Sequence, residues 1–184
     1  MSYDALVGQA MTFGDGGENP SGIGEQGFLI PVSWIKTMAK PVPSTTPGSL
    51  VTITSDYVMK TGKAPIPITA LFDKSGITWS LQGEVLSKIF QQGLEAFVPS
   101  NSVDNLGTLQ SLKNYRYIAL FPKLDDSGHY FQVGSDKIAA NITDAPGGTG
   151  VGPTGEVGSK ITLQSYGLAP VLIYQGEIPP VGPA

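Results

Sequence analysis

Hydrophobic and polar positions alternate most clearly in the stretch from Ile77 to Ser100, which no proline interrupts before Pro99. Its first part, up to Glu84, places Ile77, Trp79 and Leu81 at every second position, with polar residues between them. A period of two is typical of a strand with one buried face. The pattern therefore predicts a strand in which the Trp79 side chain packs into the core.

The second part of this stretch fits two kinds of structure. A strand is possible if a bulge near 85–87 resets the register, and residue propensity by itself favours a helix. The apolar stripe of the helix contains Val85, Leu86, Ile89, Phe90, Leu94 and Phe97. One face of the strand contains Phe90, Gln92, Leu94, Ala96 and Val98.

Shorter strand patterns precede this stretch. They cover Phe28–Ile35, Leu50–Met59 and Ile66–Phe72, and a linker rich in proline separates the first two. Pro31 indicates an edge position or a bulge, because proline donates no hydrogen bond to a sheet. Short turns between the later strands predict an antiparallel meander that continues into Ile77–Glu84.

A helix is predicted directly after Pro99, since Ser100, Asn101 and Ser102 offer N-cap oxygens. Its apolar positions are spaced by three residues and contain Val103, Leu106, Leu109 and Leu112. Further strand patterns follow at Tyr115–Phe121, His129–Val133, Lys137–Thr143, Lys160–Tyr166 and Val171–Gln175.

Composition supports a β-rich fold. The chain of 184 residues contains 24 glycines and 15 prolines, which favours many turns and few long helices. We expect a flexible N-terminal arm (1–27), one β-rich domain (28–178) with a glycine-rich loop (144–159), and a C-terminal tail (179–184). Charged residues make up only 14% of the chain, which suits a subunit that other copies cover.

The charge balance and the absence of cysteine exclude several kinds of protein. A net charge of −4 argues against a surface that grips nucleic acid. With 0 cysteines there is no disulfide frame and no thiolate ligand, and we expect no cofactor or metal. The start of the chain shows no signal peptide and no segment suited to a membrane, so we expect synthesis in the cytoplasm without membrane binding.

Candidate catalytic and binding motifs are weak. Gly150–Gly155 matches G-x-G-x-x-G, but Pro153 disfavours the helix that a nucleotide site needs. His129, the single histidine, is interpreted as a turn residue, and Asp125–Asp126 and Asp15–Glu18 lack the spacing of a calcium loop. We therefore expect no enzyme.

The order of segments from about Phe28 to Ile178 resembles phage tail tube proteins, particularly a tail tube group of Bacteroidetes-type tailed phages. The resemblance is carried by FLIPVSWIKTMAKPVP, VTITSDYVMKTGKAPIPI, SLQGEVLSKIFQQGLEAFVPS, NYRYIALFPKLDDSGHYFQVGS and ITLQSYGLAPVLIYQGEI. It covers about four fifths of the chain, through order and spacing rather than one diagnostic motif.

The resemblance implies an all-β fold, a sandwich or half-barrel of mostly antiparallel strands with one flanking helix. Residues 85–97 are then expected to be strand. Six copies would form a ring, and rings would stack into a tube that conducts genomic DNA without specific binding and contacts other tail proteins of the virion. The loop to the next ring would contain Gly147, Gly148, Gly150, Gly152, Gly155 and Glu156.

Alternation alone suggests which residues face such a channel. Thr78, Ser80, Gln82 and Glu84 lie opposite Trp79 in the strand pattern. An acidic subunit would repel phosphate and let DNA slide. The alternatives are a capsid or baseplate component, and a carbohydrate-binding β-sandwich module that stacks sugars on Trp34 or Trp79.

Overall fold

The computed structural model describes residues 7–12, 15–125 and 127–181. Parts of the predicted arm and tail, and Asp126 of the acidic pair, lie outside this range. Strands and a single α-helix make up the regular structure of the described residues, and most strand pairs are antiparallel. The predicted all-β fold with one helix is confirmed. Nowhere in the described ranges does a helix have the length and apolar character needed to span a membrane.

The elements follow the chain in this order. The strands of the first half are β1 (Gln26–Pro31), β2 (Ile35–Thr37), β3 (Thr52–Ile53), β4 (Val58–Met59), β5 (Ile66–Thr69), β6 (Gly76–Gln82) and β7 (Ile89–Val98). After the helix α1 (Val103–Leu112) come β8 (Arg116–Pro122), β9 (Tyr130–Val133), β10 (Ala140–Asp144), β11 (Gly147–Gly148), β12 (Gly158–Gly167) and β13 (Leu172–Tyr174). Short 3-10 helices lie at Val32–Trp34, Pro47–Leu50 and Phe72–Lys74.

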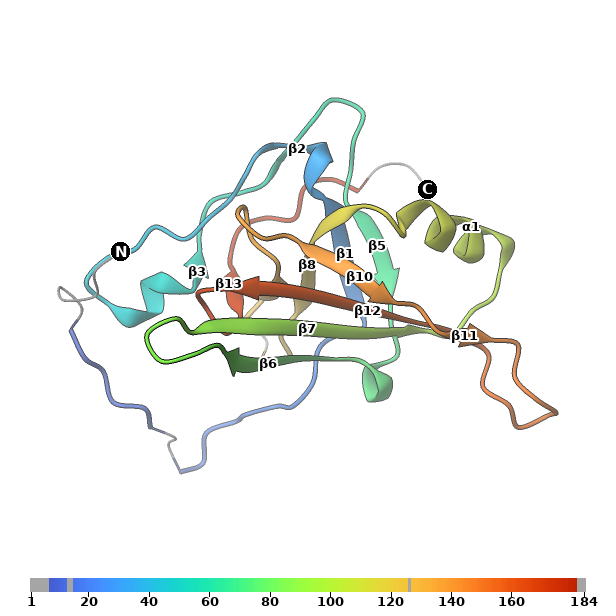
Figure 1. Ribbon diagram of the computed structural model, residues 1–184, viewed down its shortest axis with the longest axis horizontal. Coiled ribbons are helices and arrows are strands. Elements are labelled where there is room, and N and C mark those ends of the chain that lie inside the picture. Colours follow the sequence, from blue (N-terminus) through green and yellow to red (C-terminus); the bar gives the residue numbers. More distant parts are fainter. Residues whose placement is uncertain (1–6, 13–14, 126, 182–184) are drawn as a thin grey trace.

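One 11-stranded sheet forms most of the protein, and its strands run in the order β3-β13-β9-β8-β10-β12-β7-β6. β1 pairs with both β5 and β8, and β2 pairs with β4 in a small separate sheet. The sheet bends at the short pairing of β8 with β10, so that β10, β12, β7 and β6 lie in front of β8, β1 and β5 (Figure 1). The strands of this sheet therefore form a front layer and a back layer.

Two hydrophobic clusters fill the two sides of the back layer. The first lies between the layers and under α1, and its largest members are Ile23, Leu29, Leu94, Tyr117, Phe121 and Leu163. The second lies on the other side of β1 and β8, against β13, and its largest members are Phe28, Ile30, Ile53, Tyr57, Ile118, Leu120 and Tyr174. Alternate residues of β1 and β8 enter the two clusters, which explains why both strands are apolar throughout.

The predicted meander is wrong. β3 pairs with β13 in parallel, β4 pairs with β2, and β5 pairs with β1. Of the four strands β3 to β6, β6 alone pairs with the strand that follows it. The two strands within Leu50–Met59 are two residues long each, and turn residues separate them. Short turns do not show which strands pair, because burial of each apolar face decides the pairing.

The stretch from Ile77 to Ser100 forms a hairpin rather than one bulged strand. All of β6 pairs with residues 89–95 of β7, and residues 83–88 form the loop that joins the two strands. β7 is a ten-residue strand with β6 on one side and β12 on the other, so the strand alternative is confirmed for 89–98. Pairing on both sides of β7 overrides its helical propensity, while 85–88 belong to neither predicted element.

α1 follows the predicted signals closely. The Ser102 side chain accepts a hydrogen bond from the Asn105 backbone N–H at 3.2 Å, which is the expected N-cap. Leu112 is buried and Leu109 packs against the first cluster. Val103 and Leu106 remain exposed, so only the C-terminal half of the predicted apolar stripe covers the core.

At the N-terminal end, the packed body begins before the predicted boundary at residue 28. Ile23 is 2% exposed, and the Gly24 N–H donates to the Pro122 C=O at 2.9 Å. Residues 7–12 and 15–22 are all exposed. Pro31 ends β1, where β5 no longer pairs, and β1 itself is an interior strand. Pro31 itself pairs with β8 alone, so the strand is interior but its last residue has one side without a strand partner.

Candidate interaction surface

β6 is the last strand of the sheet, and no strand of the described residues pairs with its outer edge. The Phe97 C=O accepts from the Leu71 N–H at 2.9 Å, and its N–H donates to Ser75 Oγ at 3.1 Å. Both groups of Phe97 therefore point toward the β6 side of β7. Because successive residues of a strand point to opposite sides, every second residue of β7 from here bonds to β6.

The register then fixes which residues of β6 face outward. Gly76, Thr78, Ser80 and Gln82 stand opposite the β7 residues that point toward β6. The N–H and C=O groups of Ile77, Trp79 and Leu81 are thus directed to the free edge. This edge contains no proline and no bulge, the devices that usually block the addition of another strand.

The free edge of β5 provides a contrast within the same protein. The Ala70 N–H donates to the Glu25 C=O at 2.8 Å, so residues 66, 68 and 70 point toward β1. The outward positions are then Pro65, Pro67 and Thr69, and the two prolines have no N–H. The β5 edge is protected by its sequence, whereas the β6 edge is open to a partner strand.

Large apolar side chains accompany the open edge. Trp79 and Leu81 are each 52% exposed, although both lie on the face of the sheet that carries the core residue Leu94. Only Ile77 reaches the first cluster, because the hairpin extends beyond the back layer. The predicted core position of Trp79 is wrong: the alternation was right, but the strand leaves the core before it reaches Trp79.

The loop 83–88 between β6 and β7 carries two highly exposed apolar side chains. Val85 is 80% exposed and Leu86 is 101% exposed. Leu86 also has a φ of 66°, a left-handed conformation that costs a residue with a Cβ about 1–2 kcal/mol. The chain thus holds a leucine in an unfavourable backbone conformation and in full contact with water.

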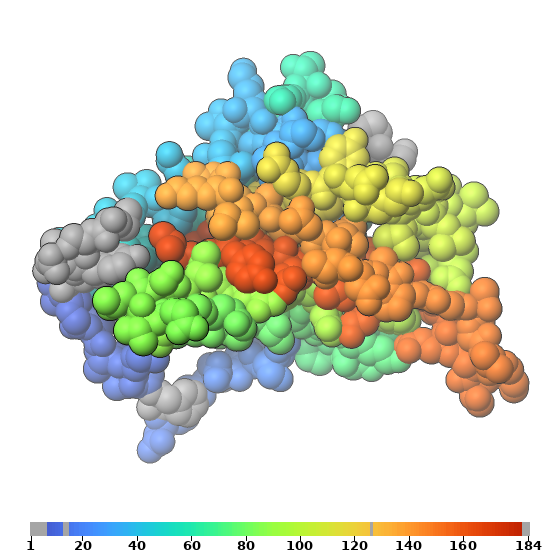
Figure 2. Space-filling model, viewed as in Figure 1, coloured from blue at the N-terminus to red at the C-terminus, as the bar shows by residue number. Residues whose placement is uncertain are grey.

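Polar side chains predominate on the other face of the hairpin and of β12, which also carries Ile89, Phe97 and Tyr166. Three predicted channel residues, Thr78, Ser80 and Gln82, lie together on this face. Figure 2 shows the hairpin in green beside β12 in red on the exposed front of the protein. The other polar residues of this face are Gln91, Glu95, Lys160, Thr162 and Gln164.

The charge of this face differs from the expected acidic surface. Its charged residues on the three strands are Glu95 and Lys160, whose side chains form an ion pair at 2.6 Å. The face is therefore neutral and rich in hydroxyl and amide groups. Glu84, the fourth predicted channel residue, is exposed in the loop beyond the end of β6.

The glycine-rich segment forms a projecting hairpin. β11 pairs with the start of β12, and the loop beyond it extends from the right side of the molecule in Figure 1. A side chain at Gly155 would collide with the Val151 backbone, and Gly150 has a φ of 73°, so this tight turn accounts for the glycine spacing. The six predicted loop residues, Gly147, Gly148, Gly150, Gly152, Gly155 and Glu156, all belong to this hairpin.

Two contacts hold the base of this hairpin. Asn101 Nδ2 donates to the Gly148 C=O at 2.6 Å, and Lys74 forms an ion pair with Glu156. The hydrogen bond that the exposed Lys74 ammonium donates to the Glu156 carboxylate raises the pKa of Lys74. These contacts leave the tip itself free, where Val151 is 92% exposed.

The remaining candidate residues form no site. His129 is half-buried at a turn, where its C=O accepts from the Lys123 N–H. Asp125 is held by Lys123 and Ser127, which lower the pKa of its carboxyl. Among the described residues, no group of three or more histidine, aspartate or glutamate side chains is placed to hold a metal.

Trp34 is not an open platform. Its ring contacts Tyr115 edge-on at 6.0 Å between centroids, and Lys63 Nζ lies 4.8 Å from the Trp34 ring. Of the two tryptophans proposed for sugar stacking, Trp79 is the more exposed: its side chain is 52% exposed, whereas Trp34 is half-buried.

A buried polar network was not predicted from the sequence. Tyr57 Oη donates to Gln132 Oε1 at 2.9 Å, and Gln132 Nε2 donates to the Gly134 C=O at 3.0 Å. Gln92 accepts from the Gly134 N–H at 3.1 Å and donates to the Ala169 C=O at 3.0 Å. Burial raises the pKa of the Tyr57 phenol. All these groups are paired, so the network is structural and ties β7 to β9.

Comparison of the chain with protein-family models, with curated proteins and with solved structures finds no significant match. The fold and the open β6 edge are therefore the basis for assigning a function.

Proposed function

We propose that this protein is a structural subunit of a phage tail tube, in which six copies close a ring and rings stack into the DNA conduit of the virion. The observation that carries the proposal is the open edge of β6. This edge combines three outward-facing backbone pairs with the half-exposed side chains of Trp79 and Leu81.

An edge of this kind is a liability in a protein that functions as a monomer, because it templates pairing with other chains. The β5 edge of the same protein carries Pro65 and Pro67 at its outward positions. Protection of one edge and exposure of the other favour a specific partner at β6. A second copy of the chain is the simplest partner, and ring closure would pair every such edge.

The polar face is suited to line a channel for DNA. Proteins grip phosphate with lysine and arginine in excess, but the only lysine on the three strands of this face is paired with Glu95. A neutral surface of threonine, serine and glutamine offers hydration without strong attachment. Thr78, Ser80 and Gln82 would face the channel, and the DNA would pass without specific binding.

The edge can be tested by proline substitution. Leu81→Pro removes an N–H that points outward, so it should preserve the hairpin and prevent assembly. Ser80→Pro removes an N–H that points toward β7, so it should destabilise the fold itself. Leu81→Val keeps the N–H and controls for the change of side chain. Sedimentation velocity over a concentration series, with circular dichroism for the fold, separates these effects.

The proposal predicts concentration-dependent oligomers for the wild type and Leu81→Val, and folded monomers for Leu81→Pro. Oligomers of unchanged size in Leu81→Pro would show that the β6 edge does not join the copies.

The exposure of Trp79 favours one second candidate, a carbohydrate-binding module. The Trp79 side chain is 52% exposed on the sheet face opposite Thr78, Gln91 and Gln164. A glycan array with the wild type and Trp79→Ala tests it. A hit that depends on Trp79, from a chain that stays monomeric, would replace the tail tube proposal.

A further inference from the structure

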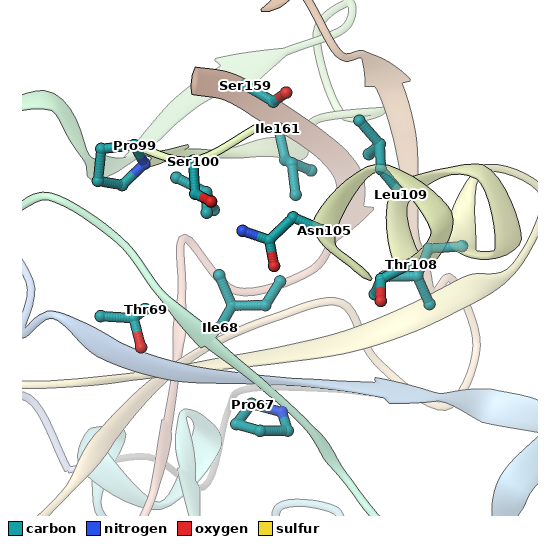
Figure 3. Close-up of a pocket in the computed structure, with 12 residues that line it drawn as sticks. Pro67, Ile68, Thr69, Pro99, Ser100, Asn105, Thr108, Leu109, Ser159 and Ile161 are labelled. Atoms are coloured by element: carbon teal, nitrogen blue, oxygen red, sulfur yellow. The ribbon is translucent and has the colours of Figure 1, made fainter. Parts of the chain in front are cut away.

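An apolar groove of about 380 Å³ opens between β5 and α1. Figure 3 shows its lining side chains, which come from β5, α1, β12 and the segment 98–100 at the end of β7. Ile68, Leu109 and Ile161 are among its apolar lining residues, and Asn105 and Thr108 are among its polar ones. The proline positions of β5 leave little backbone for a strand to pair with, so this groove suits side chains rather than an added strand.

The loop 83–88 carries side chains that fit such a groove. Val85 and Leu86 are exposed by 80% and 101%, and the Leu86 backbone is left-handed. Both features cost free energy in an isolated chain, which points to a role in binding.

The loop and the groove lie at opposite ends of the molecule. In Figure 1 the β6–β7 loop is at the left and α1 is at the right, along the longest axis. One chain therefore cannot fill its own groove. A contact between two different patches of identical chains is heterologous and repeats from copy to copy.

The loop and the helix α1 each carry one acidic and one basic residue. Glu84 and Lys88 flank the two apolar residues of the loop, and Asp104 and Lys113 lie at the two ends of α1. All four are exposed, and none takes part in the ion pairs of the described chain. The acid of the loop can therefore pair with Lys113 of a neighbouring copy, and the base of the loop can pair with Asp104.

We propose that the loop 83–88 of one copy inserts Val85 and Leu86 into the groove between β5 and α1 of the next copy, with the charges of the loop paired to those of α1. The contact rests on the proposed function and deepens it, because it would join copies of successive rings. It runs along the molecule, whereas the β6 edge faces sideways, so both contacts can form together.

Disulfide cross-linking tests the contact directly, because the chain contains 0 cysteines. Leu86→Cys and Thr108→Cys are purified separately, mixed at an assembling concentration and oxidised. We expect a cross-linked dimer in the mixture and no cross-linked dimer when either variant is oxidised alone. Leu86→Cys mixed with Val58→Cys is the matched control, since Val58 is 46% exposed and lies outside the groove.

Other segments of this chain are alternative occupants. Met11 of the N-terminal segment and Val151 of the glycine-rich hairpin are 103% and 92% exposed. Met11→Cys and Val151→Cys are each mixed with Thr108→Cys under the same conditions. A cross-link from either, without one from Leu86→Cys, would overturn the proposal.

Charge reversal provides a second test that does not depend on the orientation of the loop. One variant reverses the loop (Glu84→Lys with Lys88→Glu) and another reverses the helix ends (Asp104→Lys with Lys113→Asp). Each alone should raise the midpoint concentration of assembly roughly tenfold, and a chain with both reversals should recover. Thermal melts of the monomers control for the effect of the reversed charges on α1.

The outcomes separate this inference from the proposed function. A wild-type chain that stays monomeric at every concentration overturns both. A wild type that assembles, with no Leu86–Thr108 cross-link and no recovery in the doubly reversed chain, overturns only the loop contact. Recovery together with the cross-link supports the contact.

Discussion

Replacing Tyr57 by phenylalanine removes one oxygen from the buried network and little else. The Tyr57 side chain is 3% exposed, and its ring lies 5.2 Å from the ring of Tyr174, a contact that phenylalanine keeps. The lost hydroxyl donates to Gln132 Oε1 at 2.9 Å. Gln132 is 1% exposed, so water cannot replace the donor.

The expected cost follows from the acceptor that is left without a partner. A buried polar group that loses its hydrogen bond costs about 1–3 kcal/mol of the free energy of unfolding. In a chain of this size, each kcal/mol lowers the melting temperature by about 2–4 °C. Urea denaturation followed by circular dichroism should show this loss with an unchanged slope.

Tyr115→Phe is the matched control, because Tyr115 is 38% exposed and its hydroxyl makes no hydrogen bond among those of the described chain. We expect that control to stay within about 0.5 kcal/mol of the wild type. A Tyr57→Phe variant as stable as the control would refute the argument that this network holds β9 against the rest of the fold.

Three further predictions concern alkaline stability, the helix cap and the hairpin loop. Burial raises the pKa of Tyr57, Tyr117 and Tyr174, so the native state keeps protons that the unfolded state releases above about pH 10. Stability from these groups is therefore complete below that pH and falls above it, and tyrosinate absorbance should rise together with loss of circular dichroism. An absorbance rise of all tyrosines before unfolding would contradict this. Ser102→Ala removes the N-cap of α1 and should cost about 1 kcal/mol in urea denaturation, whereas Ser102→Asp should retain most of the stability. Leu86→Asn should stabilise the monomer by up to about 1 kcal/mol, since asparagine tolerates a left-handed backbone, and a loss of stability instead would show that Leu86 packs within its own chain.

Local signals predicted the elements whose determinants lie close together in the sequence. The cap at Ser102 and the apolar spacing up to Leu112 place α1 almost residue by residue. The alternation from Ile77 places β6 and its two faces correctly. Both depend on contacts within a few residues, which a sequence shows directly.

Long-range pairing could not be predicted in the same way. β3 pairs with β13, which lies far from it in the sequence, and no turn signal near Thr52 indicates that partner. The exposure of Trp79 depends on where the back layer ends, and the strand pattern contains no information about that limit. Propensity also favoured a helix at 85–97, where pairing of β7 on both sides decides for a strand.

The same limits apply to the interaction surface. Alternation grouped Thr78, Ser80 and Gln82 on one face, but the neutral pairing of Glu95 with Lys160 comes from two strands far apart in the sequence. The groove between β5 and α1 is also lined by segments that lie far apart in the sequence, so no single segment predicts it.

Negative-stain electron microscopy of the purified full-length chain at high concentration tests the central claim most directly. We predict rings or tubes with a central channel, and their loss in Leu81→Pro. Single compact particles at every concentration, with the β6 edge left unpaired, would contradict the proposal that copies of this chain complete one another.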